Sequence, residues 1–362
     1  MESAKHASNV EEVFRGRWAD LDNSQLLEAQ FFSANPEQLT RLLDRMPGGD
    51  EVPQIEFSYD TRGGTMVRCR HCRPNTANHH RGFVLQYRNG DRVLVGKDCG
   101  AKHFGENFNL RKNEFGAAVK RAELLKRRKH IVEHRREALQ IIEAIEGYDG
   151  WSAYSRSKRS FRSGLWEAVA GLQEAVQRRG GVLYKSDRIR DFAAEQNRKK
   201  SGPPIMVDVE VPIGVLAGQS FFTAAGELPD KQVPGLMSRL KSAIFNSVEK
   251  ADSNRELEVL FRGIDNLIEA LDVQLALVLD LTSAAAPSNL QLLCEWMHGQ
   301  GLGHYRVDSD TLYRHDAANQ VVSVKRGEGK YPVRFDIDLP RSRSPKVELD
   351  ELRSCLNLVR GG

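Results

Sequence analysis

Three of the five cysteines in this chain lie close together, in an order that limits how this part of the sequence can fold. Cys69 and Cys72 form a Cys-x-x-Cys pair, the spacing at which one tight turn can direct two thiolates to one metal ion. Cys99 and His103 are four residues apart, so their side chains share one face if a helix begins near Asp98. The two pairs together predict a four-ligand metal site.

The segment between the two pairs has the pattern of a β-hairpin. Residues 83–87, FVLQY, and 92–95, RVLV, are rich in β-branched and aromatic side chains. Between them, Asn89-Gly90 is a strong hairpin signal, because both residues tolerate a positive φ. A hairpin here would return the chain, so that a helix starting near Asp98 would lie beside the Cys-x-x-Cys turn.

The order of these elements resembles the treble-clef zinc-finger class. It consists of a turn with two thiolates, a hairpin, and two ligands on the first turn of a helix. The resemblance covers only about residues 65–110. It implies a structural Zn²⁺ ion, in a module often attached to proteins that bind nucleic acid or other proteins. The residues in its ligand positions are Cys69, Cys72, Cys99 and His103. The second pair of this class is usually Cys-x-x-Cys, so His79 and His80 are alternative fourth ligands.

The ligand set favours a structural over a catalytic metal ion. A catalytic zinc ion keeps one coordination position open for water, whereas this set fills all four positions with protein donors. The His-x-Glu and Pro-Cys-x-x-Cys motifs of the zinc deaminases are absent from the sequence. The alternative is a group of buried free thiols, since unpaired cysteine is commonly buried.

Charge is distributed unevenly along the chain. Residues 61–200 carry 31 Lys or Arg against 15 Asp or Glu, a balance of +16. Residues 1–60 carry 5 against 12, a balance of −7, and residues 201–362 carry 17 against 22, a balance of −5. The net charge of +4 therefore hides a cationic middle that contains the cysteine cluster.

Such a cationic stretch beside a zinc module is typical of proteins that bind phosphate, and it predicts DNA or RNA as a partner. The residues expected to contact nucleic acid are Arg68, Arg70, Arg73, Lys126, Arg127, Arg128 and Lys129. A basic helix can also pair with acidic segments of its own chain or with an acidic partner protein. The alternative function is therefore a zinc-stabilised scaffold that holds other proteins through its long helix.

Composition divides the chain into four predicted modules, which make a multi-domain, mostly helical α+β protein. The first is an acidic helical segment over 1–52, and the second is the zinc-binding module over 53–110. The third, 111–204, is a basic arm with a long helix and a linker. The fourth, 205–362, is an α+β module with a C-terminal antiparallel β-meander packed with helices.

Two helices are expected in the N-terminal half. Asn35 before Pro36 predicts a helix start, because the amide can cap free N–H groups and proline lacks the donor that would go unpaired. Residues 110–146 predict the longest helical segment, with Leu125 and Val132 in a heptad pattern. Arg128 and Arg135 interrupt that pattern, which favours one long packed helix or a short antiparallel helical hairpin over an extended coiled coil.

The C-terminal half predicts a mixture of strands and helices. The segment 205–216 has the pattern of a strand, which Pro212 is expected to end. Helices are expected over 255–281 and 290–297. Three runs between His304 and Leu339 predict a three-stranded meander, with HYRVDSDTLYRH as its first strand.

Signatures of common enzymes are missing, which favours a non-catalytic protein. No phosphate-binding loop, Gly-x-Ser-x-Gly, dinucleotide fingerprint or His-Glu-x-x-His occurs. A weaker alternative is a metal-dependent nuclease in the C-terminal module. Its carboxylates and lysine would be Asp308, Asp310, Glu328, Lys330, Asp336 and Asp338. Cys294, His298 and Cys355 could suggest a second metal site, but apolar neighbours favour a core thiol at Cys294.

The sequence predicts a cytoplasmic protein without membrane contact. No run of about 18 uncharged apolar residues is present to span a bilayer. The first residues, MESAKHASNVEEVF, contain acids and no apolar core segment, unlike a secretory signal. The oligomeric state is left open.

Overall fold

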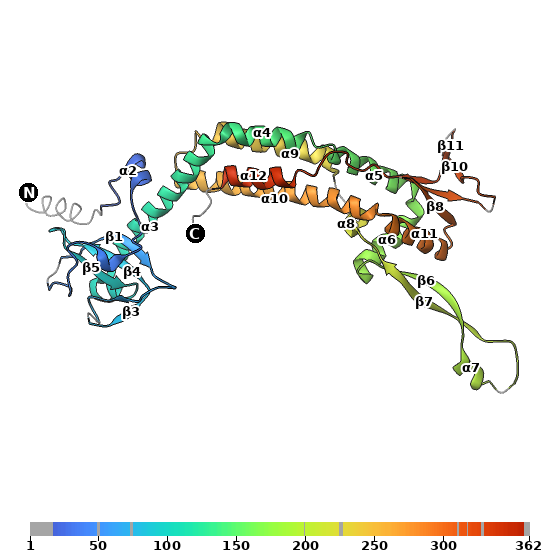
Figure 1. Cartoon of the computed structure of the whole chain (residues 1–362), viewed down its shortest axis with the longest axis horizontal. Helices are drawn as coiled ribbons and strands as arrows, with labels where there is room; N and C mark the ends of the chain where they lie inside the picture. Colours follow the sequence, from blue (N-terminus) through green and yellow to red (C-terminus); the bar gives the residue numbers. More distant parts are fainter. Residues whose placement is uncertain are drawn as a thin grey trace, which may run out of the picture. The chain divides into compact units, whose positions relative to one another are not determined.

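The computed structural model describes residues 17–48, 51–72, 75–198, 200–223, 227–309, 311–316, 318–326 and 329–357 (Figure 1). The described chain divides into two compact units. Unit 1 contains the residues up to His130 together with Asp252–Glu258, and unit 2 contains Ile131–Ala251 and the residues from Val259 onward. The predicted α+β class, with small antiparallel sheets among many helices, is confirmed.

Unit 1 is built on a three-stranded antiparallel sheet with the order β1-β4-β5. These strands are β1 (Gln54–Asp60), β4 (Arg81–Gln86) and β5 (Arg92–Gly96). The predicted hairpin is therefore confirmed, and Gly90 alone of the Asn-Gly pair has a positive φ, of 85°. A short antiparallel ribbon, β2 (Val67–Arg68) and β3 (Ala77–His79), lies between β1 and β4 in the sequence.

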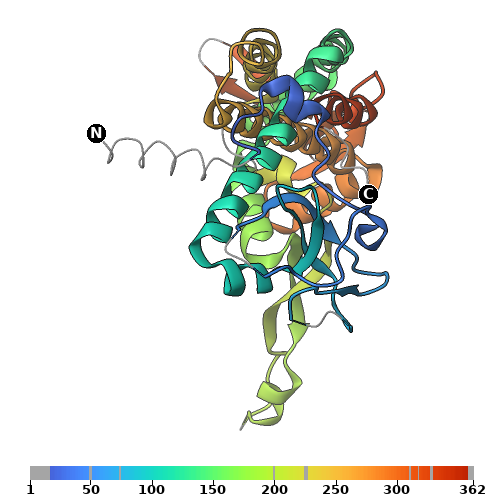
Figure 2. The ribbon, with the colours of Figure 1, turned by 90° about the vertical axis from the view of Figure 1, so that its left-hand side faces the viewer.

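A long helix, α3 (Cys99–Glu133), packs against the sheet and encloses the main core of unit 1 (Figure 2). Phe108, Phe115 and Leu125 of this helix are buried with Ile55 and Val93 of the sheet. The helix begins earlier than predicted and contains Gly105 at φ 62°. It ends at Glu133, and a second helix, α4 (Arg135–Glu146), follows, so the predicted helix over 110–146 is two helices.

Little of the region 17–48 is helical. It contains one short helix, α2 (Asn23–Glu28), and a single 3₁₀ turn, η1 (Pro36–Gln38), so the prediction of a longer helix after Asn35 is wrong. The physical reason is a competing tertiary contact, because the backbone N–H of Leu43 donates to the carbonyl of Arg92 at 2.8 Å. The chain runs extended beside β5 instead of coiling.

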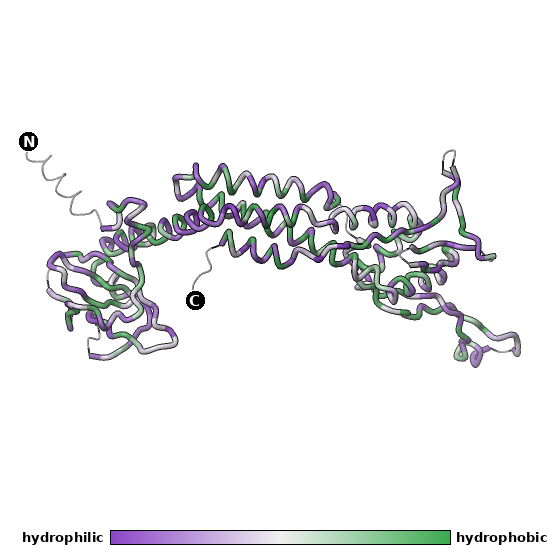
Figure 3. The backbone as a smooth tube through the Cα atoms, turned by 45° about the horizontal axis from the view of Figure 1, so that its top comes forward, coloured by the Kyte–Doolittle hydropathy of each residue, from purple (hydrophilic) through white to green (hydrophobic). Residues whose placement is uncertain are grey.

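Unit 2 is mainly helical, and apolar and polar residues alternate along its helices (Figure 3). Besides α4, its longer helices are α5 (Gly150–Gly164), α6 (Trp166–Arg179), α9 (Pro229–Ser242), α10 (Asn254–Ala284), α11 (Pro287–Gly299) and α12 (Lys346–Leu356). The shorter ones are α7 (Phe192–Gln196), α8 (Gln219–Thr223) and η2 (Ala243–Ser247). The helices predicted over 255–281 and 290–297 are confirmed as α10 and α11.

A long two-stranded ribbon of unit 2 pairs β6 (Val182–Arg190) with β7 (Met206–Val215). Pro212 does not end the strand as predicted. Its lack of an N–H donor is accommodated where the register shifts, between Leu183 and Tyr184 on the facing strand. The segment predicted as a linker before residue 205 lies in the connection between these two strands.

The C-terminal strands differ from the predicted meander. One sheet has the order β12-β9-β8, made of β8 (His304–Asp308), β9 (Thr311–His315) and β12 (Arg334–Asp336). A separate ribbon pairs β10 (Ser323–Arg326) with β11 (Gly329–Pro332). The run predicted as the first strand is a hairpin, because Ser309 turns the chain with φ 53°.

Candidate metal centre

The three predicted cysteine ligands of unit 1 lie together. The sulfur atoms of Cys69, Cys72 and Cys99 are all within 4.8 Å of one another, and those of Cys72 and Cys99 are 3.3 Å apart. Cys69 is buried, Cys99 is partly buried and Cys72 is exposed. This group could hold a metal ion, and among the residues that the structure describes it is the one such group of Cys, His, Asp and Glu side chains.

Local structure explains why the three sulfurs converge. Cys69 directly follows β2, and the next residue is tied to the sheet because the N–H of Arg70 donates to the carbonyl of Leu94 at 2.8 Å. Asn78 of β3 accepts from the N–H of Cys69 at 3.3 Å and donates its amide to the Cys72 sulfur at 3.7 Å. Cys99 begins α3 immediately after β5, so the hairpin brings it back to this turn.

Gly100 permits the close packing that places Cys99. A Cβ atom at this position would lie 2.3 Å from the ring of Phe108, a distance that real Cβ atoms do not adopt. The absence of a side chain lets the first turn of α3 fold tightly over the core. The glycine after the third cysteine is therefore part of the site's architecture.

The three thiols do not share one electrostatic environment. Burial raises the pKa of the Cys69 thiol, but the neighbouring His79 side chain and the N–H groups of Cys72 and Gly96 outweigh it and lower that pKa to about 5. Burial and the two adjacent sulfurs raise the pKa of Cys99 to about 12. A divalent cation would remove this conflict, because it stabilises thiolates that otherwise repel one another.

Three histidines were predicted as possible fourth ligands, and their surroundings differ. The ring of His103, the predicted fourth ligand, lies 4.4 Å from the ring of His71 and 4.6 Å from that of Phe104. His79 lies on β3, where Tyr59 Oη contacts its Nδ1 at 3.2 Å, while its Nε2 is buried and no hydrogen bond satisfies it. The Nδ1 of His80 lies 3.1 Å from the carbonyl of Thr61.

Some of the residues predicted to contact nucleic acid already pair with acidic residues of unit 1. Arg68 and Arg70 both pair with Glu37, and Arg70 is only 4% exposed. Arg73 lies outside the described residues. The basic run on α3 consists of Lys126, Arg127, Arg128 and Lys129, of which Lys126 and Lys129 are exposed and Arg128 pairs with Asp252 at 3.7 Å.

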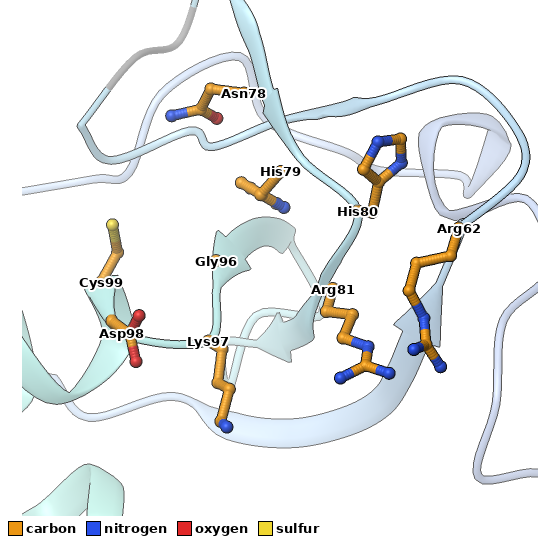
Figure 4. A pocket seen from close by; sticks show the side chains of 9 residues that line it. All are labelled: Arg62, Asn78, His79, His80, Arg81, Gly96, Lys97, Asp98 and Cys99. Atoms are coloured by element: carbon orange, nitrogen blue, oxygen red, sulfur yellow. The ribbon is translucent and has the colours of Figure 1, made fainter.

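A hollow of about 470 Å³ adjoins the cysteine cluster and holds cationic residues that the prediction did not select (Figure 4). Arg62, Arg81 and Lys97 line it, and so does Cys99. Arg81 and Lys97 lie at the ends of neighbouring strands, a relation that only strand pairing reveals. No local sequence pattern marks these residues, because they lie far apart in the sequence and meet only through strand pairing.

Two carboxylates of the nuclease alternative are engaged in ion pairs. Asp336 pairs with Arg334 at 3.0 Å, and Asp338 pairs with Arg156 of α5. Asp310 and Glu328 lie outside the described residues. Cys294 is partly buried, and burial raises the pKa of its thiol to about 11, which fits the expected core thiol.

No helix among the described residues is both long and apolar enough to cross a membrane. Comparison of the chain with models of protein families, with curated proteins and with solved structures found no match.

Proposed function

We propose that unit 1 holds a structural Zn²⁺ ion through Cys69, Cys72, Cys99 and His79, and that the metal-stabilised module binds nucleic acid. Three cysteine sulfurs within 4.8 Å of one another support the first part. Soft thiolate ligands select zinc over calcium and magnesium, and zinc sites with four protein donors are structural. The bound ion would stabilise the fold of the module and supply no reaction chemistry.

His79 fits the fourth ligand position better than His103 does. Its side chain lies close enough to Cys69 to lower the pKa of that thiol, and its Nε2 atom is buried without a partner at hydrogen-bond geometry. Such a buried polar atom costs free energy unless a partner is bound. Its other ring nitrogen contacts the Tyr59 hydroxyl, as the second nitrogen of metal-bound histidines usually contacts a protein group. The His103 ring is exposed and lies against other rings.

Replacing His79 with alanine is expected to lower zinc affinity by more than about 100-fold, since loss of a ligand exceeds the effect of losing a supporting group. His103→Ala is the matched control and should change the affinity less than about 10-fold. Competition with a chromogenic chelator measures both. Equal losses in the two variants, or a loss in His103→Ala alone, would contradict the assignment of His79.

One observation carries the nucleic-acid part of the proposal. The +16 balance of residues 61–200 belongs to the same stretch of chain that contains all three clustered cysteines. A positive charge of this size attracts phosphate backbones regardless of sequence, and a rigid metal-stabilised module would display part of it in a fixed shape. The exposed Lys126 and Lys129 of α3 add to the same field.

Binding of labelled single-stranded and duplex oligonucleotides, followed by fluorescence anisotropy at two salt concentrations, tests this proposal. We expect affinity to fall steeply with salt, because binding releases counterions from the phosphates. Replacing Lys126 and Lys129 together with glutamine should reduce the slope of log affinity against log salt by about 2. Lys231→Gln, an exposed lysine of unit 2, is the control. Absence of binding at low salt would overturn the nucleic-acid proposal.

A further inference from the structure

The hollow beside the cysteine cluster collects side chains from three strand ends of unit 1 (Figure 4). Arg62 follows β1, Arg81 begins β4 and Lys97 follows β5. The N–H of Lys97 donates to the carbonyl of Arg81 at 3.4 Å, which keeps these two residues adjacent. In Figure 4 the side chains of Arg62, Arg81 and Lys97 extend in a common direction along one side of the hollow.

Positive charge exceeds negative charge around this group. Arg62 and Arg81 each donate from Nε to one oxygen of Asp60 at 2.9 Å. These hydrogen bonds, that of Arg62 foremost, hold the pKa of the Asp60 carboxyl well below its usual range. One carboxylate neutralises only one of the two guanidinium groups, and each guanidinium carries five N–H donors, more than Asp60 can occupy. Asp60 therefore fixes both arginines in place and leaves one of their two positive charges uncompensated.

Lys97 adds a further positive charge, which no group among the described residues neutralises through an ion pair. Its side chain is exposed. Two guanidinium groups and an ammonium group around one hollow are donors that recognise a phosphate.

We propose that this hollow binds one phosphate group of a nucleic-acid backbone, with Lys97 as the point charge and Arg81 and Arg62 as flanking donors. The inference rests on the proposed nucleic-acid binding and gives it a contact site. Cys99 belongs both to the metal cluster and to the wall of the hollow, so the metal ion would fix the geometry of this contact. The site differs from the residues predicted from the sequence, of which Arg70 is buried.

Replacement of Asp98 is expected to change the binding affinity in the direction opposite to replacement of Lys97. Its carboxylate lines the same hollow, between Lys97 and the first residue of α3. A carboxylate repels an incoming phosphate, so its removal should strengthen binding, whereas removal of the Lys97 charge should weaken it. A merely structural effect of these exposed substitutions would not produce opposite changes.

The experiment measures binding of a short labelled single strand and its duplex to the zinc-loaded full chain by fluorescence anisotropy. Lys97→Gln is expected to weaken binding about 5-fold and to reduce the salt slope by about 1. Asp98→Asn is expected to strengthen binding. Lys102→Gln, an exposed lysine on α3 that does not line the hollow, is the matched control and should change binding less than Lys97→Gln.

The outcomes separate this inference from the proposed function. If the wild type binds and Lys97→Gln and Asp98→Asn bind equally well, the hollow is not the contact, although nucleic-acid binding stands. If the wild type does not bind at low salt, both fail. If inorganic phosphate binds the wild type more tightly than Lys97→Gln, while the oligonucleotide binds both equally, the hollow takes free phosphate and the backbone assignment is overturned.

Discussion

Replacement of Cys69 by serine, or removal of zinc with a strong chelator, is expected to lower the free energy of unfolding of unit 1 by roughly 4 kcal/mol or more. Cys69 is fully buried, and its sulfur lies beside those of Cys72 and Cys99. Without the ion, only short pairing holds this region, because β2 and β3 contain two and three residues. Hydrogen exchange should show lost protection in β2, β3 and the first turn of α3.

The β4–β5 hairpin should keep its protection in the same experiment, because Val93 and Leu94 are buried in cores that do not depend on the sulfurs. Cys294→Ser, in unit 2 and outside the cluster, is the control and should leave zinc content and unit 1 unchanged. Elemental analysis that finds no stoichiometric zinc in the wild type, together with an unaltered unfolding free energy in Cys69→Ser, would contradict the metal centre.

The cysteine cluster was predictable because its determinants are local in sequence. The Cys-x-x-Cys spacing, the Asn-Gly turn and the helix start at Cys99 each act within a few residues, and the antiparallel hairpin joins them. The environment of His79 was not predictable, since it depends on Tyr59, a residue 20 positions away on β1. The burial of Arg70 was not predictable for the same reason, because its partner Glu37 lies 33 positions away in the sequence.

The polar helix α5 shows how a tertiary contact can bury polar residues. Its sequence is rich in serine and arginine, yet Ser155, Ser157 and Lys158 are buried. The hydroxyl of Ser157 donates to the carbonyl of Asp338 at 3.1 Å and accepts from the N–H of the same residue at 2.7 Å. The hydroxyl group of Ser157 thus satisfies the backbone of Asp338, which follows β12. No sequence pattern within α5 reveals this partner.

Replacing Lys158 with methionine is expected to stabilise the protein in mild acid. It should also remove the contribution of this lysine to the pH dependence of the unfolding free energy. Lys158 is only 1% exposed, its Nζ donates to the carbonyl of Phe221, and the rings of Phe161 and Phe221 lie 5.5 and 5.1 Å from it. Burial, reinforced by the charge of Arg162, lowers the pKa of Lys158 from 10.5 to about 7. The folded state therefore disfavours the ammonium form, while the unfolded chain accepts it freely.

The sign follows from proton binding. Between about pH 7 and 10.5 the unfolded chain binds a proton at this lysine that the folded protein does not, so the wild type gains stability as pH rises through this window and loses it as pH falls. The advantage of Lys158→Met over the wild type should accordingly shrink by roughly 4 kcal/mol from pH 6 to pH 10.5. Urea unfolding at several pH values measures the difference in unfolding free energy between the variant and the wild type. The titration of other groups cancels in this difference. Lys231→Met, at an exposed lysine of α9, is the control. A difference between Lys158→Met and the wild type that does not change with pH would show that Lys158 is protonated equally in both states.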